Sequence, residues 1–279
     1  MGARRHIAVL AAAALLAGCG GAARTERTVP VTRTAIDASI APVTTPQVPR
    51  GPHDAPVPIL MYHVIDAAPP GAAEPGLWVP WGRFEREMGA LAHAGFHAVT
   101  LATVHRAWHR RGSLPVHPIV ISFDDGYQSQ YDHARATLER LHWPGVLNLE
   151  VHNVDEKGGL SRGQVARMVR DGWELDAHTL THPDLTTLDA RSLRHEVAGS
   201  RRWLRRVFGV PVSFFAYPAG RYDATVEAAV RRAGYRGATT TQPGVASPRE
   251  DPYALPRVRV MPEMTPAELV GLLRGMAHA

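Results

Sequence analysis

The segment Ile119-Val120-Ile121-Ser122-Phe123-Asp124-Asp125-Gly126 joins a run of branched apolar residues to two adjacent carboxylates and a glycine. Three consecutive branched apolar residues predict a strand that is buried on both faces, as in parallel sheets. Because neighbouring side chains of a strand point to opposite faces, Asp124 and Asp125 can share a cavity only where the chain turns, at Gly126. Parallel α/β folds place their active sites at this end of their strands. A helix-capping aspartate followed by a turn residue is the simpler interpretation, and this segment alone does not exclude it.

Residues 1–19 have the pattern of an export signal, with Arg4 and Arg5 before an apolar run over 7–16 that is too short to span a bilayer. The run ends in Leu16-Ala17-Gly18-Cys19, which resembles the lipobox of bacterial lipoproteins. This resemblance implies that Cys19 is lipidated and that the protein is extracytoplasmic and anchored to the cell membrane. The alternative is an ordinary secretory peptide with a chance cysteine. Cys19 is the only cysteine of the chain, so no intramolecular disulfide can form.

Residues 20–56 are rich in Thr, Pro, Ala and Val and show no persistent period, which predicts a disordered Pro/Thr-rich tether. Residues 57–279 have a length that suits one α/β domain better than two. The net charge of +5 suits a cell envelope rich in anionic polymers. The basic residues are spread over predicted helices without interleaved aromatic residues, so we expect no nucleic-acid partner.

Strand-like and helix-like segments alternate through the domain. Repeated β-then-α units predict a parallel sheet, and about seven strands predict a distorted (β/α)7-like barrel of the α/β class. The predicted strands lie at 58–63, 96–101, 119–125, 146–151, 173–178, 213–217, 235–240 and 255–260.

The segment His178-Thr179-Leu180-Thr181-His182 follows one of these strands, which places its two imidazoles on a loop or on a first helical turn. A spacing of four residues brings both rings to one side if that turn is helical. With one carboxylate, the two histidines would form a metal site with open positions for water and substrate. The chain contains 15 histidines, so this pair is weak evidence by itself.

Three segments, each at the end of a predicted strand, carry the polar residues of a candidate active site. They are Ser122-Phe123-Asp124-Asp125-Gly126, the run from Glu174 to Leu185 that contains both histidines, and Phe215-Ala216-Tyr217-Pro218-Ala219-Gly220. Together and in this order they resemble the polysaccharide deacetylases, the NodB-homology domain of carbohydrate esterase family 4. The resemblance runs from about Pro58 to Val260, and it implies a NodB-type barrel that hydrolyses acetyl groups from a polysaccharide.

The resemblance also implies a metal site and a base. The family's metal ligands correspond to Asp125, His178 and His182, and its general base corresponds to Asp124. We expect one divalent metal ion, with zinc as the first choice and cobalt, nickel or iron as alternatives. Amide hydrolysis needs an activated water, and a divalent metal lowers the pKa of its bound water while Asp124 takes the proton.

Two further roles follow from the resemblance. The residue matching Tyr217 offers its backbone N–H to the oxyanion that forms during hydrolysis. The strand Tyr62-His63-Val64-Ile65 resembles the start of the permuted branch that includes poly-N-acetylglucosamine deacetylases, which implies His63 as the general acid. The alternative is that His63 is a satisfied histidine at a strand end.

The chain departs from the family pattern at two places. Ala216 stands where common members carry the arginine that pairs with the base, and Arg257 on the last predicted strand is a candidate replacement among several arginines. The C-terminal block with a catalytic histidine is missing, because His278 lies too close to the end of the chain. Placing the general acid at His63 explains this second absence.

Four functions are compatible with these residues. The first choice is a metal-dependent hydrolase that removes N-acetyl groups from a cell-surface or extracellular polysaccharide containing N-acetylglucosamine, with the membrane as a second partner through Cys19. An O-acetyl esterase acting on an acetylated glycan such as xylan would use the same site. A non-haem iron oxygenase also uses two histidines and a carboxylate, but the export signal argues against it. A glycan-binding lipoprotein without activity is the last alternative, because all the main positions are chemically competent.

Overall fold

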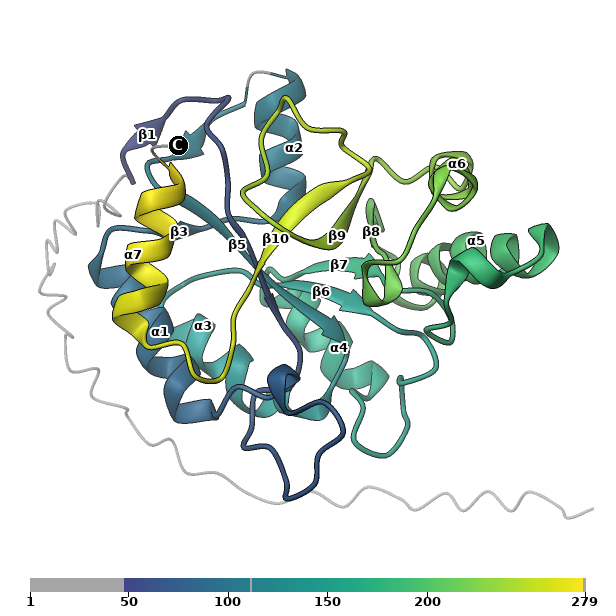
Figure 1. Cartoon of the computed structure of the whole chain (residues 1–279), viewed down its shortest axis with the longest axis horizontal. Helices are drawn as coiled ribbons and strands as arrows, with labels where there is room; N and C mark the ends of the chain where they lie inside the picture. Colours follow the sequence, from purple (N-terminus) through teal and green to yellow (C-terminus); the bar gives the residue numbers. More distant parts are fainter. Residues whose placement is uncertain (1–47, 111, 278–279) are drawn as a thin grey trace, which may run out of the picture. The chain divides into compact units, whose positions relative to one another are not determined.

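The computed structural model of the chain describes residues 48–110 and 112–277. Its strands are β1 (Arg50–Gly51), β2 (Ile59–Tyr62), β3 (His97–Ala98), β4 (Leu114–Pro115), β5 (Pro118–Asp125), β6 (Val146–Leu149), β7 (Glu174–Ala177), β8 (Phe214–Ala216), β9 (Gly237–Pro243) and β10 (Leu255–Arg259). Seven of them pair in parallel in the order β2-β10-β9-β8-β7-β6-β5, and β5 pairs back onto β2 (Figure 1). This closed ring confirms the predicted distorted (β/α)7-like barrel.

Helices cover the outside of the ring (Figure 1). They are α1 (Trp81–His93), α2 (Leu101–Arg110), α3 (Ala136–Arg140), α4 (Arg162–Arg170), α5 (Ala190–Phe208), α6 (Ala224–Arg232) and α7 (Pro266–Ala277), with short helical turns at Pro75–Leu77, Gln130–Arg135, Leu185–Thr187 and Pro218–Gly220. Local sequence sets where several of them begin. A capping box opens α4, since Ser161 Oγ accepts a hydrogen bond from the Gln164 amide and Gln164 Oε1 accepts one from the Ser161 amide.

The region after α1 differs from the sequence-based expectation. A strand was predicted over 96–101, but only His97–Ala98 pairs with the start of β5. The Thr100 hydroxyl accepts a hydrogen bond from the Thr103 amide and thereby caps α2, which begins at Leu101. The capping interaction outweighs the strand propensity of this apolar segment.

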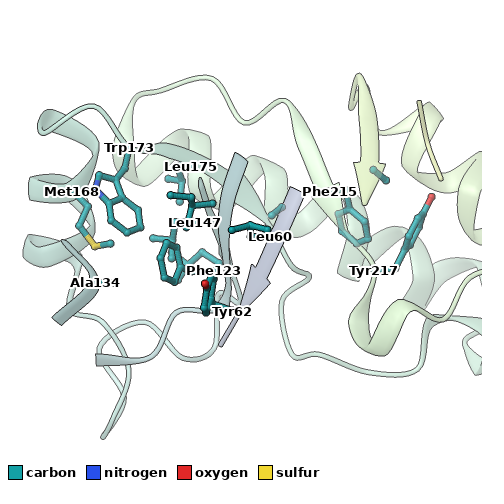
Figure 2. Close-up of a cluster of buried hydrophobic side chains, with 14 of the residues drawn as sticks. Leu60, Tyr62, Phe123, Ala134, Leu147, Met168, Trp173, Leu175, Phe215 and Tyr217 are labelled. Atoms are coloured by element: carbon teal, nitrogen blue, oxygen red, sulfur yellow. The ribbon is translucent and has the colours of Figure 1, made fainter. Parts of the chain in front are cut away.

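Strand β5 is buried along its whole length. Ile119, Ile121 and Phe123 belong to the apolar cluster between the barrel and its helices. Figure 2 shows Phe123 within this cluster, beside Tyr62 and Trp173, at ring-centroid distances of 5.7 and 5.1 Å. The alternate residue Val120 belongs to the second cluster, on the other face of the strand. Burial of each such side chain contributes about 1.5–3 kcal/mol, so the register of β5 and the point where it ends are strongly determined.

The described chain starts inside the predicted tether. Arg50–Gly51 pairs with β4, and Ala55 accepts a hydrogen bond from the Trp108 indole, so this end of the 20–56 segment lies on the domain. The predicted signal segment 1–19, the lipidation site Cys19 and residues 20–47 of the tether lie outside the described residues. Among the helices of the described ranges, none combines the length and the apolar composition that a membrane-spanning helix requires.

Candidate active site

The two aspartates at the end of β5 leave the strand in different ways. Asp124 continues the row of Val120 and Ser122 on one face of the strand. Asp125 would by alternation face the other side, but its φ of 73° turns the chain. Gly126 follows with a φ of 88°, and a Cβ there would lie 2.2 Å from a methyl carbon of Leu149. The positive φ and the approach of Leu149 favour glycine at this turn, which brings both carboxylates to the carboxyl end of the barrel.

The structure brings Asp125, His178 and His182 together. Asp125 Oδ1 lies 3.4 Å from His178 Nε2 and 3.7 Å from His182 Nε2, and one potential ligand atom from each residue lies within 4.8 Å of the others. Asp125 Oδ1 is buried and has no hydrogen-bond partner among the described residues. A buried acceptor without a donor costs free energy, and a divalent cation held by the three atoms would satisfy it. The residues present therefore fit the implied metal ion.

The tautomer of His178 is set by the neighbouring strand. Its Nδ1 lies 2.8 Å from the carbonyl oxygen of Ala216, so Nδ1 carries the proton and donates, and Nε2 keeps its lone pair for an ion. Burial by itself lowers the pKa of His178, yet the neighbouring carboxylates of Asp125 and Asp124 raise it above the ordinary value. The same negative field attracts a metal cation.

The loop that carries the two histidines is held by a carboxylate from α5. Glu196 Oε2 accepts hydrogen bonds from the amides of Leu180 and Thr181 at 2.8 and 3.0 Å, and Glu196 Oε1 accepts one from the Thr181 hydroxyl. Within the loop, Thr179 Oγ1 accepts a hydrogen bond from the His182 amide, and both residues have positive φ values of 71° and 54°. Such left-handed conformations persist only where surrounding contacts fix them, and Glu196 supplies these contacts.

Asp124 is saturated with hydrogen bonds. Arg257 donates to both carboxylate oxygens, Nη1 to Oδ1 and Nη2 to Oδ2, each at 2.8 Å, and Asn148 Nδ2 donates to Oδ1 at 2.7 Å. Burial alone raises the pKa of Asp124, but the charge and hydrogen bonds of Arg257 hold it well below the usual range. Asp124 is therefore a carboxylate at any physiological pH.

Arg257 occupies the position proposed for the missing family arginine. It is 1% exposed and lies inside the barrel, where its Nε donates to the Thr240 carbonyl at 2.7 Å. Its strand, β10, lies between β2 and β9, so the guanidinium approaches Asp124 from a strand far along the chain. Ala216 instead offers only its carbonyl oxygen, to His178.

His63 lies just beyond the end of β2, next to Asp124. Its Nε2 is 3.8 Å from Asp124 Oδ2, and its side chain is 12% exposed. Burial is the largest influence on the ring and outweighs the nearby carboxylates, so the pKa of His63 is lowered and the resting imidazole is neutral. Gln130 fixes the two residues relative to each other, because its Nε2 donates to the carbonyl oxygens of both His63 and Asp124.

The structure corrects the expectation for Tyr217. Its amide donates to the Thr239 carbonyl at 3.1 Å, and its hydroxyl donates to the Tyr253 carbonyl, so the amide is committed to the sheet. The turn at Pro218–Gly220 follows directly, with Ala219 at a φ of 51°. Pro218 has no N–H and the Gly220 amide donates to the Tyr217 carbonyl, which leaves the amide of Ala219 as the candidate donor of this turn.

Three supporting residues escaped the sequence reasoning. Asn148 is the partner of Asp124 in the β5–β6 register, and a polar residue in an otherwise apolar strand was the signal that could have revealed it. Gln130 and Glu196 lie on helical segments, where a single buried polar side chain is not distinguishable from a solvated one by sequence. His278 lies outside the described residues.

Comparisons with known proteins show the family of this chain. The family model described as Polysaccharide deacetylase matches residues 111–238. YxkH of Bacillus subtilis (strain 168), whose name assigns it to the polysaccharide deacetylases, is 30% identical over 211 residues, which are 76% of this chain and 74% of that protein. This chain belongs to the polysaccharide deacetylase family.

As a polysaccharide deacetylase of the NodB type, the chain is a hydrolase. The solved structure of the Streptococcus pyogenes deacetylase PplD in complex with acetate has a TM-score of 0.74 and 26% identity, covering 80% of this chain and 99% of that one. A poly-beta-1,6-N-acetyl-D-glucosamine N-deacetylase of Staphylococcus epidermidis is 25% identical over 173 residues, 55% of this chain and 58% of that protein. The matched family segment ends inside β9, so both His63 and Arg257 lie outside it.

Proposed function

We propose that this polysaccharide deacetylase is a metal-dependent enzyme that removes N-acetyl groups from a cell-surface or extracellular polysaccharide containing N-acetylglucosamine. The observation that carries the proposal is the arrangement of Asp125 Oδ1, without a donor, opposite the Nε2 atoms of His178 and His182. The similarity to the Staphylococcus epidermidis N-deacetylase supports an N-acetylated substrate. We propose zinc as the ion, with cobalt, nickel and iron as alternatives, because imidazole and carboxylate suit all four.

Asp124 is the proposed base. Asp125, His178 and His182 would hold a divalent ion, which would supply a water of lowered pKa and polarise the acetyl carbonyl. Asp124 stays ionised because of Arg257, and its oxygens lie beside the trio without belonging to it. A base of low pKa is a weak one, so Asp124 acts on a water whose own pKa has been lowered and holds that proton only briefly.

His63 is the proposed proton donor to the leaving nitrogen. Its Nε2 is 3.8 Å from Asp124 Oδ2, close enough for the proton taken up by Asp124 to pass to the imidazole through a small movement. The lowered pKa of His63 makes its protonated form a stronger acid than an ordinary imidazolium. We propose the amide of Ala219, in place of that of Tyr217, as the main-chain donor to the oxyanion.

We also propose that the enzyme is extracytoplasmic and anchored to the membrane through a lipid on Cys19. The sequence pattern of residues 1–19 supports this. Labelling of the expressed chain with a radioactive fatty acid should succeed for the wild type and fail for Cys19→Ser. Equal labelling of the two would exclude this anchor.

The catalytic proposal is tested with N-acetylglucosamine oligomers and an O-acetylated xylan in parallel. Wild-type enzyme should release acetate and free amine from the oligomers, lose activity on chelation and regain it with zinc or cobalt. Asp124→Asn should lower kcat by about 10²- to 10⁴-fold while the metal content stays unchanged. Acetate release from xylan alone would assign an O-acetyl esterase instead, and activity that survives complete chelation would remove the metal from the proposal.

A further inference from the structure

A cleft of about 690 Å³ opens beside the loop that carries His178 and His182. Thr181 and Pro183 line it and flank His182, whose side chain is 37% exposed. The opposite wall is formed by α5, which lies next to β7 (Figure 1). The volume falls in the range of pockets that hold small ligands, and Thr181 and Pro183 place the cleft beside the loop that carries the two histidines of the trio.

The wall from α5 is basic. Arg191, Arg194, His195 and Arg202 all line the cleft and are exposed. The other three follow Arg191 by three, four and eleven residues, which keeps them on one face of the helix. Within the described ranges, the side chains of Arg191, Arg194 and Arg202 form no hydrogen bond or ion pair, whereas Arg221, Arg231 and Arg257 each pair with a carboxylate.

The nearby carboxylates are already engaged. Asp189 caps α5 by accepting hydrogen bonds from the amides of Arg191 and Ser192. Asp184 pairs with Arg221 at 2.8 Å. Glu196 belongs to the lining, but its two oxygens accept three hydrogen bonds from the histidine loop. The lining holds three arginines and the single carboxylate of Glu196, so the cleft keeps a positive charge that a partner from outside can meet.

We propose that this cleft is a subsite for an acidic sugar of the polysaccharide substrate, one that carries a carboxylate. Guanidinium groups bind carboxylates in bidentate fashion, and several of them lie on one wall of the cleft. Like charges at helical spacing also repel one another and destabilise α5, and a bound anion would offset this repulsion. The inference rests on the proposed function, since it assigns the class of polymer that enters the same site. A chain bound across the centre would place an acidic residue in the cleft while a neighbouring N-acetylated sugar meets the metal trio.

The test compares two hexasaccharides, a hyaluronan fragment that alternates N-acetylglucosamine with glucuronate, and the neutral N-acetylglucosamine hexamer. Binding to the metal-loaded full chain is measured by calorimetry at about 50 mM and about 300 mM salt, because screening weakens exposed charge pairs. The variant Arg191→Gln/Arg194→Gln removes two charges from the cleft. The matched control Arg205→Gln/Arg206→Gln removes two charges from the last turn of the same helix, outside the cleft.

We expect the wild type to bind the hyaluronan fragment more tightly than the neutral hexamer, with a preference that falls at high salt. The cleft variant should bind the fragment about tenfold more weakly, and the control variant should match the wild type. Equal weakening in both variants, or no preference for the acidic fragment, would overturn the subsite. Acetate release from the neutral hexamer by the wild type reports on the proposed function alone, so the two proposals fail separately.

Discussion

The two consecutive aspartates at the end of β5 belong to regions of opposite character. Asp124 lies in the barrel, where Arg257 and Asn148 from neighbouring strands satisfy both of its oxygens. Asp125 lies among loops, where its Oδ1 faces two imidazoles and lacks a donor. In the first region the protein's own side chains satisfy the carboxylate, whereas in the second the carboxylate oxygen has no donor and would be satisfied by a cation. The difference teaches that one turn at Gly126 separates the proposed base from the proposed ion-binding centre.

The largest effect should come from the ion-binding region. Asp125→Asn removes the charge that the trio needs, so we expect loss of bound metal and a fall of acetate release to background. The unfolding free energy of the metal-free protein should fall only slightly, because Asp125 Oδ1 has no hydrogen bond to lose and the variant gives up only the attraction to the nearby imidazoles, which lowers the pKa of Asp125 against the effect of burial. Metal content by mass spectrometry and urea unfolding check both results, with the exposed Asp54→Asn as control. Retained metal in Asp125→Asn would show that the ion does not depend on the Asp125 carboxylate, which would contradict the distinction between the two aspartates.

The barrel region should respond in stability and in pH dependence. Arg257→Met leaves a buried carboxylate without its cation, which costs about 3–5 kcal/mol of unfolding free energy. Because Arg257 is what lowers the pKa of Asp124 against burial, the pKa rises in the variant. The base is then protonated at higher pH, so the acid limb of kcat/KM moves upward.

Urea unfolding and a pH profile of kcat/KM measure the two effects of Arg257→Met. The exposed Arg249→Met serves as the charge-matched control and should change neither. An acid limb that stays in place would show that Arg257 does not tune the base.

Glu87 on α1 is a further buried carboxylate that can be compared with Asp124. Its partner is a hydroxyl group, and it forms no ion pair with a cation. Tyr62 donates a hydrogen bond to Glu87 Oε2, while burial raises the pKa of Glu87 from its ordinary value near 4.5 to about 7. A raised carboxyl pKa favours the folded state at low pH, and this stability is lost as pH rises from about 4.5 through about 7.

Glu87→Gln should therefore be more stable than the wild type above neutral pH, by roughly 1–2 kcal/mol, and should lose this advantage in acid. Thermal unfolding across pH measures the difference, with the exposed Glu263→Gln as control. A constant difference at all pH values would mean that the effect is packing rather than titration.

The smallest effect should come from the support of the histidine loop. Glu196→Gln replaces an acceptor of three hydrogen bonds by a group with one oxygen, so the loop loosens and metal affinity should fall about tenfold. Competition with a chromogenic chelator measures this affinity. The exposed Glu250→Gln should bind metal as the wild type does, and an unchanged affinity in Glu196→Gln would show that the loop holds its shape without this carboxylate.

The sequence predicted those parts of the site that follow from strand ends. A branched apolar run ending at Gly126 predicted where two carboxylates emerge, and the segment after β7 predicted two histidines at the same edge. Distant partners could not be predicted in this way. Arg257 was one candidate among several arginines, because only the order of strands in the ring decides which guanidinium meets Asp124.

The Tyr217 expectation was wrong for a related reason. Whether an amide is free or bonded to the next strand depends on register, and the Tyr217 amide pairs with Thr239. The strand predicted over 96–101 was too long, because a threonine cap decides the start of α2 and only His97–Ala98 pairs with β5. Both errors arise where a single hydrogen bond outweighs a pattern spread over several residues.

The pairing of β2 with both β5 and β10 makes activity depend on the completed chain. His63 arrives with the first strand of the ring and Arg257 with the last, so a chain still emerging from the ribosome, or one truncated before residue 255, carries Asp124 without its counterion. Contacts between such distant segments form slowly. Closure of the barrel and formation of the Arg257–Asp124 pair, which keeps the proposed base ionised, therefore occur in the same folding step.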